Sequence, residues 1–295
     1  MNNLKVINVQ VLNAFVEDDK GGNPAGVVLD ADNLTHKNKL EIAKKVGLSE
    51  TAFVSKSKTE DFKLEFFTPN RQIAHCGHAT VATFSYLKQQ NILKRNNSSK
   101  ETIDGKRYIK LIDDNAFMEQ VAPKHLNVSH KEQLILASLG LQKNDLLPNA
   151  PLQVVNTGNS FLLVPVKNED VLKNITPNFK TISKISDEFD LIGFYVFTTA
   201  ITIQKKDANS RMFAPRYHII EEAATGMAAG PLACYLYNVL NIKKNRYLIR
   251  QGQYMDQPSP SLIIVDMQIK NNTIINLMVG GKGILKSKVS IEINS

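Results

Sequence analysis

In the first half of the chain, strand-type alternation of apolar and polar residues gives way to helix-type spacing and back again. Residues 5–15 alternate, which predicts a strand, whereas residues 38–46 place apolar side chains close to helical spacing and Gly47 is the expected helix end. Further predicted elements are strands over 25–29, 51–55 and 62–67, and a helix that starts near Gly77. This mixture of strands and helices indicates an α+β fold.

Two polar stretches interrupt this pattern. Residues 91–106 are rich in Lys, Asn and Ser, which predicts a loop or hairpin with little to bury. A shift in composition near residues 121–133 predicts a linker from Pro123 to His130. We therefore expect an N-terminal domain over residues 1–122 and a C-terminal domain over 123–295, whose last strand can return to the first domain. Residues 280–283, which contain three glycines, are expected to form a hairpin turn.

The second half of the chain repeats motifs of the first half in the same order. The matched pairs are Gly22-Asn23-Pro24 with Gly158-Asn159-Ser160, Thr51–Val54 with Gly193–Val196, and Phe67-Thr68-Pro69 before Gly77 with Phe213-Ala214-Pro215 before Gly226. Three matches in one order predict a duplicated α+β unit. Because ligand pockets favour domain interfaces, we expect the site to lie between the copies.

Composition, charge and motifs argue against nucleic-acid binding, a membrane span and a metal or cofactor site. The 295 residues carry a net charge of +8, but the lysines are scattered in short runs, so we expect no nucleic-acid partner. The longest apolar stretch, residues 191–203, is too short to span a membrane. No metal-ligand spacing and no dinucleotide fingerprint appear, so neither a metal nor a cofactor is expected. The two cysteines are expected to be reduced, in a cytoplasmic protein.

Two short turns that lead into apolar helices are candidate anion sites. They are Cys76-Gly77-His78-Ala79-Thr80 and Thr225-Gly226-Met227-Ala228-Ala229-Gly230. The first N–H groups of a helix lack intrahelical partners, and glycine lets a carboxylate approach them. The alternative is that these glycines only permit tight helix entry.

Four ionisable residues near these turns have both a chemical and a structural interpretation. Glu50 is a solvated carboxylate or a general acid/base, which would require burial to raise its pKa. His78 is expected to stay neutral beside the helix start, as a substrate contact or a packing residue. Glu221 and Glu222 precede the second turn, where they favour the helix dipole or share a proton.

The same motifs resemble those of the phenazine-biosynthesis PhzF-like family, which belongs to the diaminopimelate-epimerase-like superfamily. The resemblance covers almost the whole chain. It is carried by Asn23–Val28, Leu48–Thr51, Cys76–Thr80, Arg211–Arg216, Ala224–Gly226, and Gln251-Gly252 with Pro258-Ser259. It implies two pseudo-symmetric domains, each a mixed sheet wrapped around a central helix, with the active site in the cleft between them.

The resemblance also implies a function. It points to a cofactor-independent isomerase, usually a homodimer, that moves a proton between carbons of a small carboxylate-bearing metabolite. Glu50 is then the principal acid/base, with His78 and Glu222 as the other expected catalytic residues. The expected substrate-binding residues are Cys76, Gly77, Ala79, Thr225, Gly226, Met227, Gln251 and Gly252.

The chain departs from the family pattern in its second half. Glu222-Ala223 stands where the family has Asp-Pro, and Met227 where it has Ser. Epimerases of the superfamily use two facing thiols, but here Cys76 is matched by Thr225, which favours chemistry centred on Glu50. The departures support an alternative, a catalytically weakened or inactive small-molecule-binding protein with the same fold.

Overall fold

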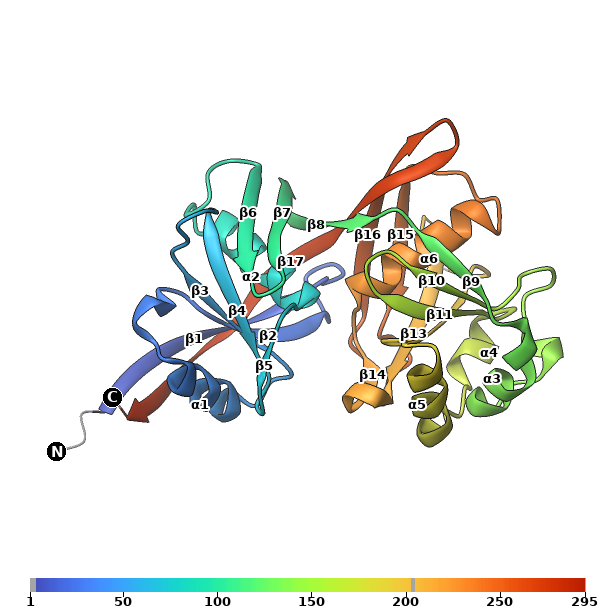
Figure 1. Cartoon of the computed structure of the whole chain (residues 1–295), viewed down its shortest axis with the longest axis horizontal. Coiled ribbons are helices and arrows are strands. Elements are labelled where there is room, and N and C mark those ends of the chain that lie inside the picture. The colour runs from blue at the N-terminus through green and yellow to red at the C-terminus, as the bar shows by residue number, and fades with distance from the viewer. Residues whose placement is uncertain (1–3, 203–204, 295) are drawn as a thin grey trace. The chain divides into compact units, whose positions relative to one another are not determined.

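A computed structural model describes residues 4–202 and 205–294, and the chain divides into two compact units. The first unit comprises Met1–Glu119 and Gly280–Ser295, and the second comprises Gln120–Val279. The first and last strands pair antiparallel from Leu4 opposite Asn294 to Ala14 opposite Gly283, as the blue and red ribbons of Figure 1 show. The C-terminal segment is therefore part of the first unit's sheet.

The first unit is a mixed sheet that surrounds one helix. Its strands are β1 (Leu4–Ala14), β2 (Asn23–Val28), β3 (Thr51–Ser55), β4 (Phe62–Phe67), β5 (Gln72–Ile73), β6 (Asn97–Thr102) and β7 (Gly105–Ile112), while β8 (Asn115–Val121) and β17 (Thr273–Asn294) have residues in both units. Helix α2 (Gly77–Gln89) contacts β1, β2, β3 and β7, and every residue from Gly77 to Leu87 is buried. Helix α2 is thus the core of this unit.

Helix α1 (His36–Val46) packs outside the first unit's sheet, where Ile42 and Ala43 join a second apolar cluster with Phe53 and Phe67. Thr35 caps its start by accepting a hydrogen bond from Asn38 N. Gly47, in the left-handed conformation, ends it as the sequence predicts. The chain then passes directly to Glu50 and β3.

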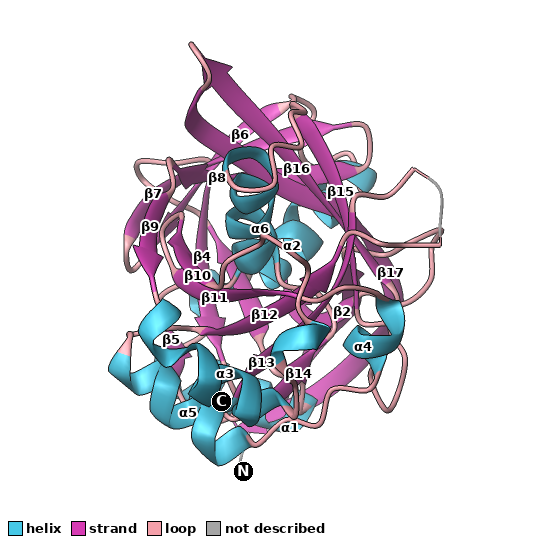
Figure 2. Ribbon diagram, turned by 90° about the vertical axis from the view of Figure 1, so that its right-hand side faces the viewer, coloured by secondary structure: helices cyan, strands magenta, loops and turns pink. Residues whose placement is uncertain are grey.

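The second unit has the same plan. Its strands are β9 (Lys124–Asn127), β10 (Gln153–Asn156), β11 (Ser160–Pro165), β12 (Gly193–Thr198), β13 (Ala208–Ala214), β14 (Ile219–Glu222), β15 (Arg246–Gln251) and β16 (Ser261–Lys270). Helix α6 (Gly226–Asn238) is its buried core helix, in contact with β10, β11 and β16. Helices α3 (Glu132–Leu139), α4 (Glu169–Lys173) and α5 (Phe179–Glu188) lie outside the sheet, α3 beside α5 (Figure 2).

Strand pairing confirms the predicted duplication. In the first unit, β1–β2, β3–β4 and β6–β7 are antiparallel, whereas β2–β3 and β4–β6 are parallel. The second unit repeats this order in β10–β11, β11–β12, β12–β13, β13–β15 and β15–β16. Each copy encloses its own helix, so the predicted fold, a mixed sheet wrapped around a central helix in each of two similar domains, is confirmed.

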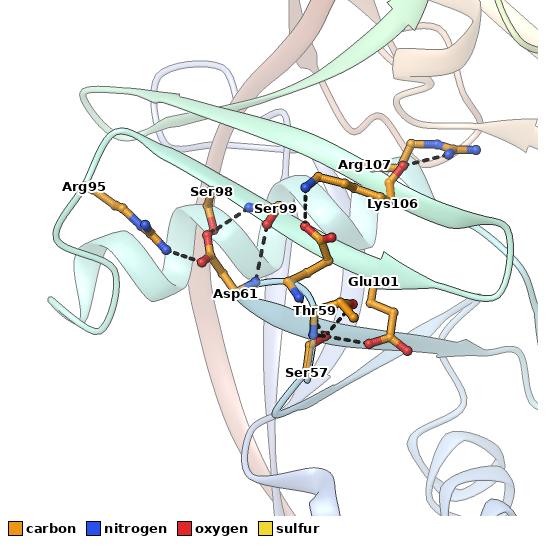
Figure 3. A network of polar contacts seen from close by, with 10 residues as sticks. Ser57, Thr59, Asp61, Arg95, Ser98, Ser99, Glu101, Lys106 and Arg107 are labelled. Carbon is orange, nitrogen blue, oxygen red and sulfur yellow. Dashed lines mark hydrogen bonds and ion pairs between the residues drawn. The ribbon is translucent and has the colours of Figure 1, made fainter.

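The polar stretch 91–106 contains β6 and the start of β7, which form a hairpin, but the expectation that this stretch buries little is wrong. Alternate residues of β6, Ser98, Lys100 and Thr102, are buried. The loop before β4 fixes the hairpin through Asp61, whose carboxylate pairs with Arg95 and accepts hydrogen bonds from Ser98 Oγ and Ser99 N (Figure 3). Polar side chains are accommodated here because they find polar partners.

The predicted linker is also wrong in part, because Lys124–Asn127 forms β9 and pairs antiparallel with β10. All four side chains of β9 are exposed, so backbone hydrogen bonds, which composition does not reveal, hold this edge strand.

The glycines at residues 280–283 lie inside β17 and do not form the predicted turn. A Cβ on Gly280 would lie 2.7 Å from Phe117 Cα, and one on Gly283 would lie 3.0 Å from Ala82 Cα. Glycine is therefore used here for close approach to β8 and α2.

The structure also describes most of the apolar stretch 191–203; its residues 193–198 form β12, and Ile203 lies outside the described residues. Among the described helices, none has the length and apolar character needed to cross a membrane.

Candidate active site

Glu50 and His78 meet in the first unit. Glu50 directly precedes β3, and its carbonyl oxygen accepts a hydrogen bond from Gly26 N at 3.0 Å. His78 is the second residue of α2. Glu50 Oε2 lies 3.2 Å from His78 Nε2, and the two side chains are 14% and 10% exposed. The alignment is not that of a hydrogen bond, so Oε2 has no hydrogen-bond donor among the described residues. The two groups form a nearly buried ion pair.

Cys76, the residue before α2, completes a cluster with this pair. Its Sγ lies 3.6 Å from His78 Nδ1, and the side chain is buried and not in a disulfide. The nearest ligand-type atoms of Glu50, Cys76 and His78 lie within 4.8 Å of one another. The structure thus brings together three of the residues that the sequence singled out.

The charges of this pair differ from the expectation. Burial lowers the pKa of His78, but the Cys76 sulfur and the Glu50 carboxylate outweigh burial and hold the pKa well above its ordinary value. Burial raises the pKa of Glu50, but His78 and a hydrogen bond from Ser49 bring it below its ordinary value. The predicted neutral imidazole is therefore wrong, and the Glu50 pKa is not raised as the acid/base alternative was expected to require. Close partners act more strongly than the partial charge of a helix end.

A buried lysine that the sequence analysis missed fixes the start of α2. Lys100 Nζ donates a hydrogen bond to Thr80 Oγ1 at 2.6 Å, and Thr80 Oγ1 donates to the carbonyl oxygen of Cys76 at 2.6 Å. Lys100 is fully buried over the Phe66 ring, and burial lowers its pKa to about 7. The sequence carries no signal of this burial, because residues 97–102 are all polar.

His75 directly precedes Cys76 in the chain, whereas His78 follows it. Burial, together with Lys100, lowers the pKa of His75 to about 3, and its Nδ1 has no hydrogen-bond partner among the described residues. His75 is therefore neutral near pH 7, in contrast to His78.

The start of α6 in the second unit is held by neutral groups. Gln251 is fully buried: its Oε1 accepts hydrogen bonds from Thr225 N at 3.1 Å and Tyr195 Oη at 3.0 Å. Its Nε2 donates to the Glu222 carbonyl oxygen at 2.6 Å and to Thr225 Oγ1 at 3.1 Å. All the hydrogen-bonding capacity of the Gln251 amide is thus directed at the protein itself.

Gly252, the next residue, lies against the same loop. Its φ is +85°, and a Cβ there would lie 2.6 Å from the Ala223 carbonyl oxygen and also against that of Ser259. Only glycine fits this close approach. Gln251 and Gly252 together fix the segment Glu222–Thr225 before α6.

The two adjacent glutamates have different surroundings. Glu221 forms a bidentate ion pair with Arg211, whose Nε and Nη2 each lie 2.8 Å from a carboxylate oxygen. This pair assigns Glu221 a structural role. Glu222 is half-buried at the end of β14.

The remaining candidates lie at the two helix starts. Gly77 and Ala79 are buried in the first turn of α2, as is Gly226 in α6. Met227 is half-buried, and its Sδ lies 3.3 Å from Asn159 Nδ2. Cys234 is fully buried within α6, as the sequence predicts, and burial raises the pKa of its thiol to about 12.

Comparison with known proteins matches residues 12–288 to the model of the phenazine biosynthesis-like protein family. The chain belongs to this family. It is 30% identical to an uncharacterized isomerase of Clostridium acetobutylicum over 99% of this chain and 100% of that protein. It is 28% identical to the trans-2,3-dihydro-3-hydroxyanthranilate isomerase of Pseudomonas fluorescens over 94% of this chain and 96% of that protein.

A solved structure supports the same assignment. The Bacillus anthracis phenazine biosynthesis protein of the PhzF family superposes with a TM-score of 0.87 at 28% identity, covering 98% of this chain and 100% of that one. The predicted family and fold are therefore confirmed, as is the predicted enzyme class, an isomerase of the PhzF type.

Proposed function

We propose that the chain is a cofactor-independent isomerase of a small carboxylate-bearing metabolite and that Glu50 is its general acid/base. The observation that carries this proposal is the ion pair of Glu50 Oε2 and His78 Nε2, 3.2 Å apart and largely withdrawn from water. The lowered pKa of Glu50 keeps its carboxylate ionised at neutral pH, which is the state that can accept a proton.

The proposed reaction moves one proton between two carbon atoms. Glu50 accepts the proton from the first carbon, the electron pair shifts the double bond, and Glu50, whose carboxyl proton exchanges with solvent, delivers a proton to the second carbon. His78, as the imidazolium beside Glu50, orients the carboxylate and stabilises negative charge that develops on the substrate. Glu222 is the proposed second acid/base group.

The substrate carboxylate is proposed to bind at helix starts. The first intrahelical donor of α2 is Thr80 N, so the N–H groups of Gly77, His78 and Ala79 precede the intrahelical ladder. Thr225, Gly226 and Met227 are the corresponding proposed contacts at the start of α6. Cys76 is a proposed contact beside His78, and Gln251 and Gly252 are proposed to act as positioning residues.

The named substrate of the Pseudomonas fluorescens relative, an anthranilate derivative, carries a carboxylate and is the first compound to test. Relatives named as isomerases favour turnover over the alternative of an inactive binding protein. The expected homodimer and cytoplasmic location stay predictions.

Transfer of deuterium from D₂O to carbon tests the proposal. Glu50→Gln keeps the size of the side chain and removes its basicity, so deuterium incorporation should fall by about 10²–10⁴-fold. Glu41→Gln, on the outer helix α1, is the control and should match the parent protein. If Glu50→Gln exchanges deuterium at the parent rate, Glu50 is not the acid/base.

A further inference from the structure

We propose that Glu50, Cys76 and His78 form a binding site for Zn²⁺, which closes the site to substrate when it is bound. The inhibition rests on the proposed function, whereas the metal site itself rests only on the geometry of the first unit.

The ligand atoms are grouped closely enough to converge on one ion after small side-chain movements. Zinc bonds of about 2.3 Å to sulfur and about 2.0 Å to nitrogen or oxygen place neighbouring ligand atoms about 3.3–3.6 Å apart. Glu50 Oε2 and His78 Nε2 are 3.2 Å apart, and Cys76 Sγ lies 4.0 Å from the same nitrogen and 3.6 Å from Nδ1. All three ligand atoms lie within 4.8 Å of one another. Small side-chain shifts are enough to bring all three atoms onto one ion.

The donor types select a borderline-soft cation. Thiolate, imidazole and carboxylate are the three ligand types that zinc uses in proteins, whereas Mg²⁺ and Ca²⁺ prefer oxygen alone. Glu50 Oε2 is buried and has no hydrogen-bond donor among the described residues, so a lone pair is open to the ion. Zinc takes the place of the proton on Nε2 and of any proton on Sγ, and these protons leave to solvent.

The geometry is that of an open site. Three protein ligands leave the fourth position to water, a pattern that structural zinc sites, which have four protein ligands, do not show. The second copy provides a natural comparison, since Ile192, Thr225 and Met227 occupy the matching sequence positions. Those residues offer no carboxylate, thiolate or imidazole, so we expect one ion per chain.

Cobalt spectroscopy on the full-length, metal-free protein tests the site directly, because Co²⁺ reports thiolate ligation by colour. We expect one equivalent of Co²⁺ to give a thiolate-to-cobalt charge-transfer band and the visible bands of a four-coordinate ion, and Zn²⁺ to bleach both. Cys76→Ser should abolish the charge-transfer band, and Glu50→Gln should weaken binding at least tenfold. Cys234→Ala is the matched control and should retain the full spectrum.

Three results would overturn the metal site: no charge-transfer band in the parent protein, a band that survives Cys76→Ser, or one that disappears in Cys234→Ala. Circular dichroism of each variant separates loss of a ligand from loss of the fold. If the cobalt spectrum forms as expected while Glu50→Gln still exchanges deuterium, the metal site stands and the proposed acid/base role fails.

Discussion

The starts of α2 and α6 are two copies of one structural device with different chemistry. Each follows a strand pair, opens at a glycine and is buried over most of its length. The α2 start carries Glu50, Cys76 and His78, whereas the matching positions before and within α6 hold Ile192, Thr225 and Met227. Duplication has therefore kept the scaffold in both units, whereas the Glu-Cys-His cluster is present only in the first.

The side chains that hold the two helix starts in place also differ in whether they can ionise. Lys100 lies on β6 and Gln251 on β15, which are equivalent strands, and each donates a hydrogen bond to a threonine at its helix start. The anchor of the first unit is an ionisable amine, and that of the second is a neutral amide. We therefore expect pH to act on the α2 start and not on the α6 start.

Replacing Gly252 should give the largest loss of stability. Gly252→Ala combines an unfavourable φ with contact against two carbonyl oxygens, and we expect it to cost about 3–5 kcal/mol. Gly105→Ala is the control, because Gly105 has a similar φ of +97° but no neighbour within 4 Å of the added Cβ. Chemical denaturation should show that this control costs about 1–2 kcal/mol; equal losses would mean that the close approach is unimportant.

Removing the amide anchor of α6 is expected to have the next largest effect. Gln251→Leu leaves the Thr225 N–H, the Tyr195 hydroxyl and the Glu222 carbonyl without their buried partner, at a cost of about 2–4 kcal/mol. Urea unfolding measures the loss. Gln253→Leu, a neighbour that is not buried against Thr225, is the comparison, and a similar loss there would argue against a specific anchor.

Removing the amine anchor of α2, Lys100, should have the opposite effect in acid: the protein should become more stable. The pKa of Lys100 falls from 10.5 when unfolded to about 7 when folded, so the unfolded chain binds more protons and stability rises with pH from about 7 to 10. Lys100→Met should flatten this rise and stabilise the protein by about 2–4 kcal/mol at pH 6.

Melting temperatures across pH 6–9 measure the effect of Lys100→Met. The exposed Lys110→Met, on β7, should leave the slope of stability against pH unchanged. A parent protein whose stability is flat across this range would show that Lys100 is not a buried titrating group.

The smallest expected effect is a change in the pKa of His78, which NMR can detect. Because the Glu50 carboxylate raises the pKa of His78, Glu50→Gln should lower it, as an NMR titration of the histidine ring protons would show. Met227→Leu, the change at the matching position of the second copy, should leave the His78 titration unchanged. A His78 pKa that does not respond to Glu50→Gln would mean that the two groups are not coupled.

The sequence predicts most of what local pattern and repetition encode. The helix end at Gly47, the strand pair over residues 51–67 and the two glycine-led helices follow from spacing and turn chemistry. The family resemblance assigns Glu50 and His78 to one reaction, but residues 28 positions apart carry no spacing signal of contact.

Features that depend on tertiary partners could not be predicted. The sequence alone indicates that Lys100 is a surface residue, because its buried partners, Thr80 and Phe66, are brought beside it only by folding. The charge of His78 depends on two neighbours supplied by folding. The edge strand β9 is held by backbone hydrogen bonds to β10, and the glycines of β17 serve close packing that only the fold reveals.

The central claim is that proton transfer depends on Glu50, and deuterium exchange in a metabolite mixture tests it most directly. The protein is incubated in D₂O with trans-2,3-dihydro-3-hydroxyanthranilate and, separately, with a bacterial metabolite extract, and carbon-bound deuterium is read by mass spectrometry. The account predicts a labelled carboxylate compound with the parent protein and with Glu41→Gln, and at least a hundredfold less with Glu50→Gln. Equal labelling by the parent protein and Glu50→Gln would contradict it.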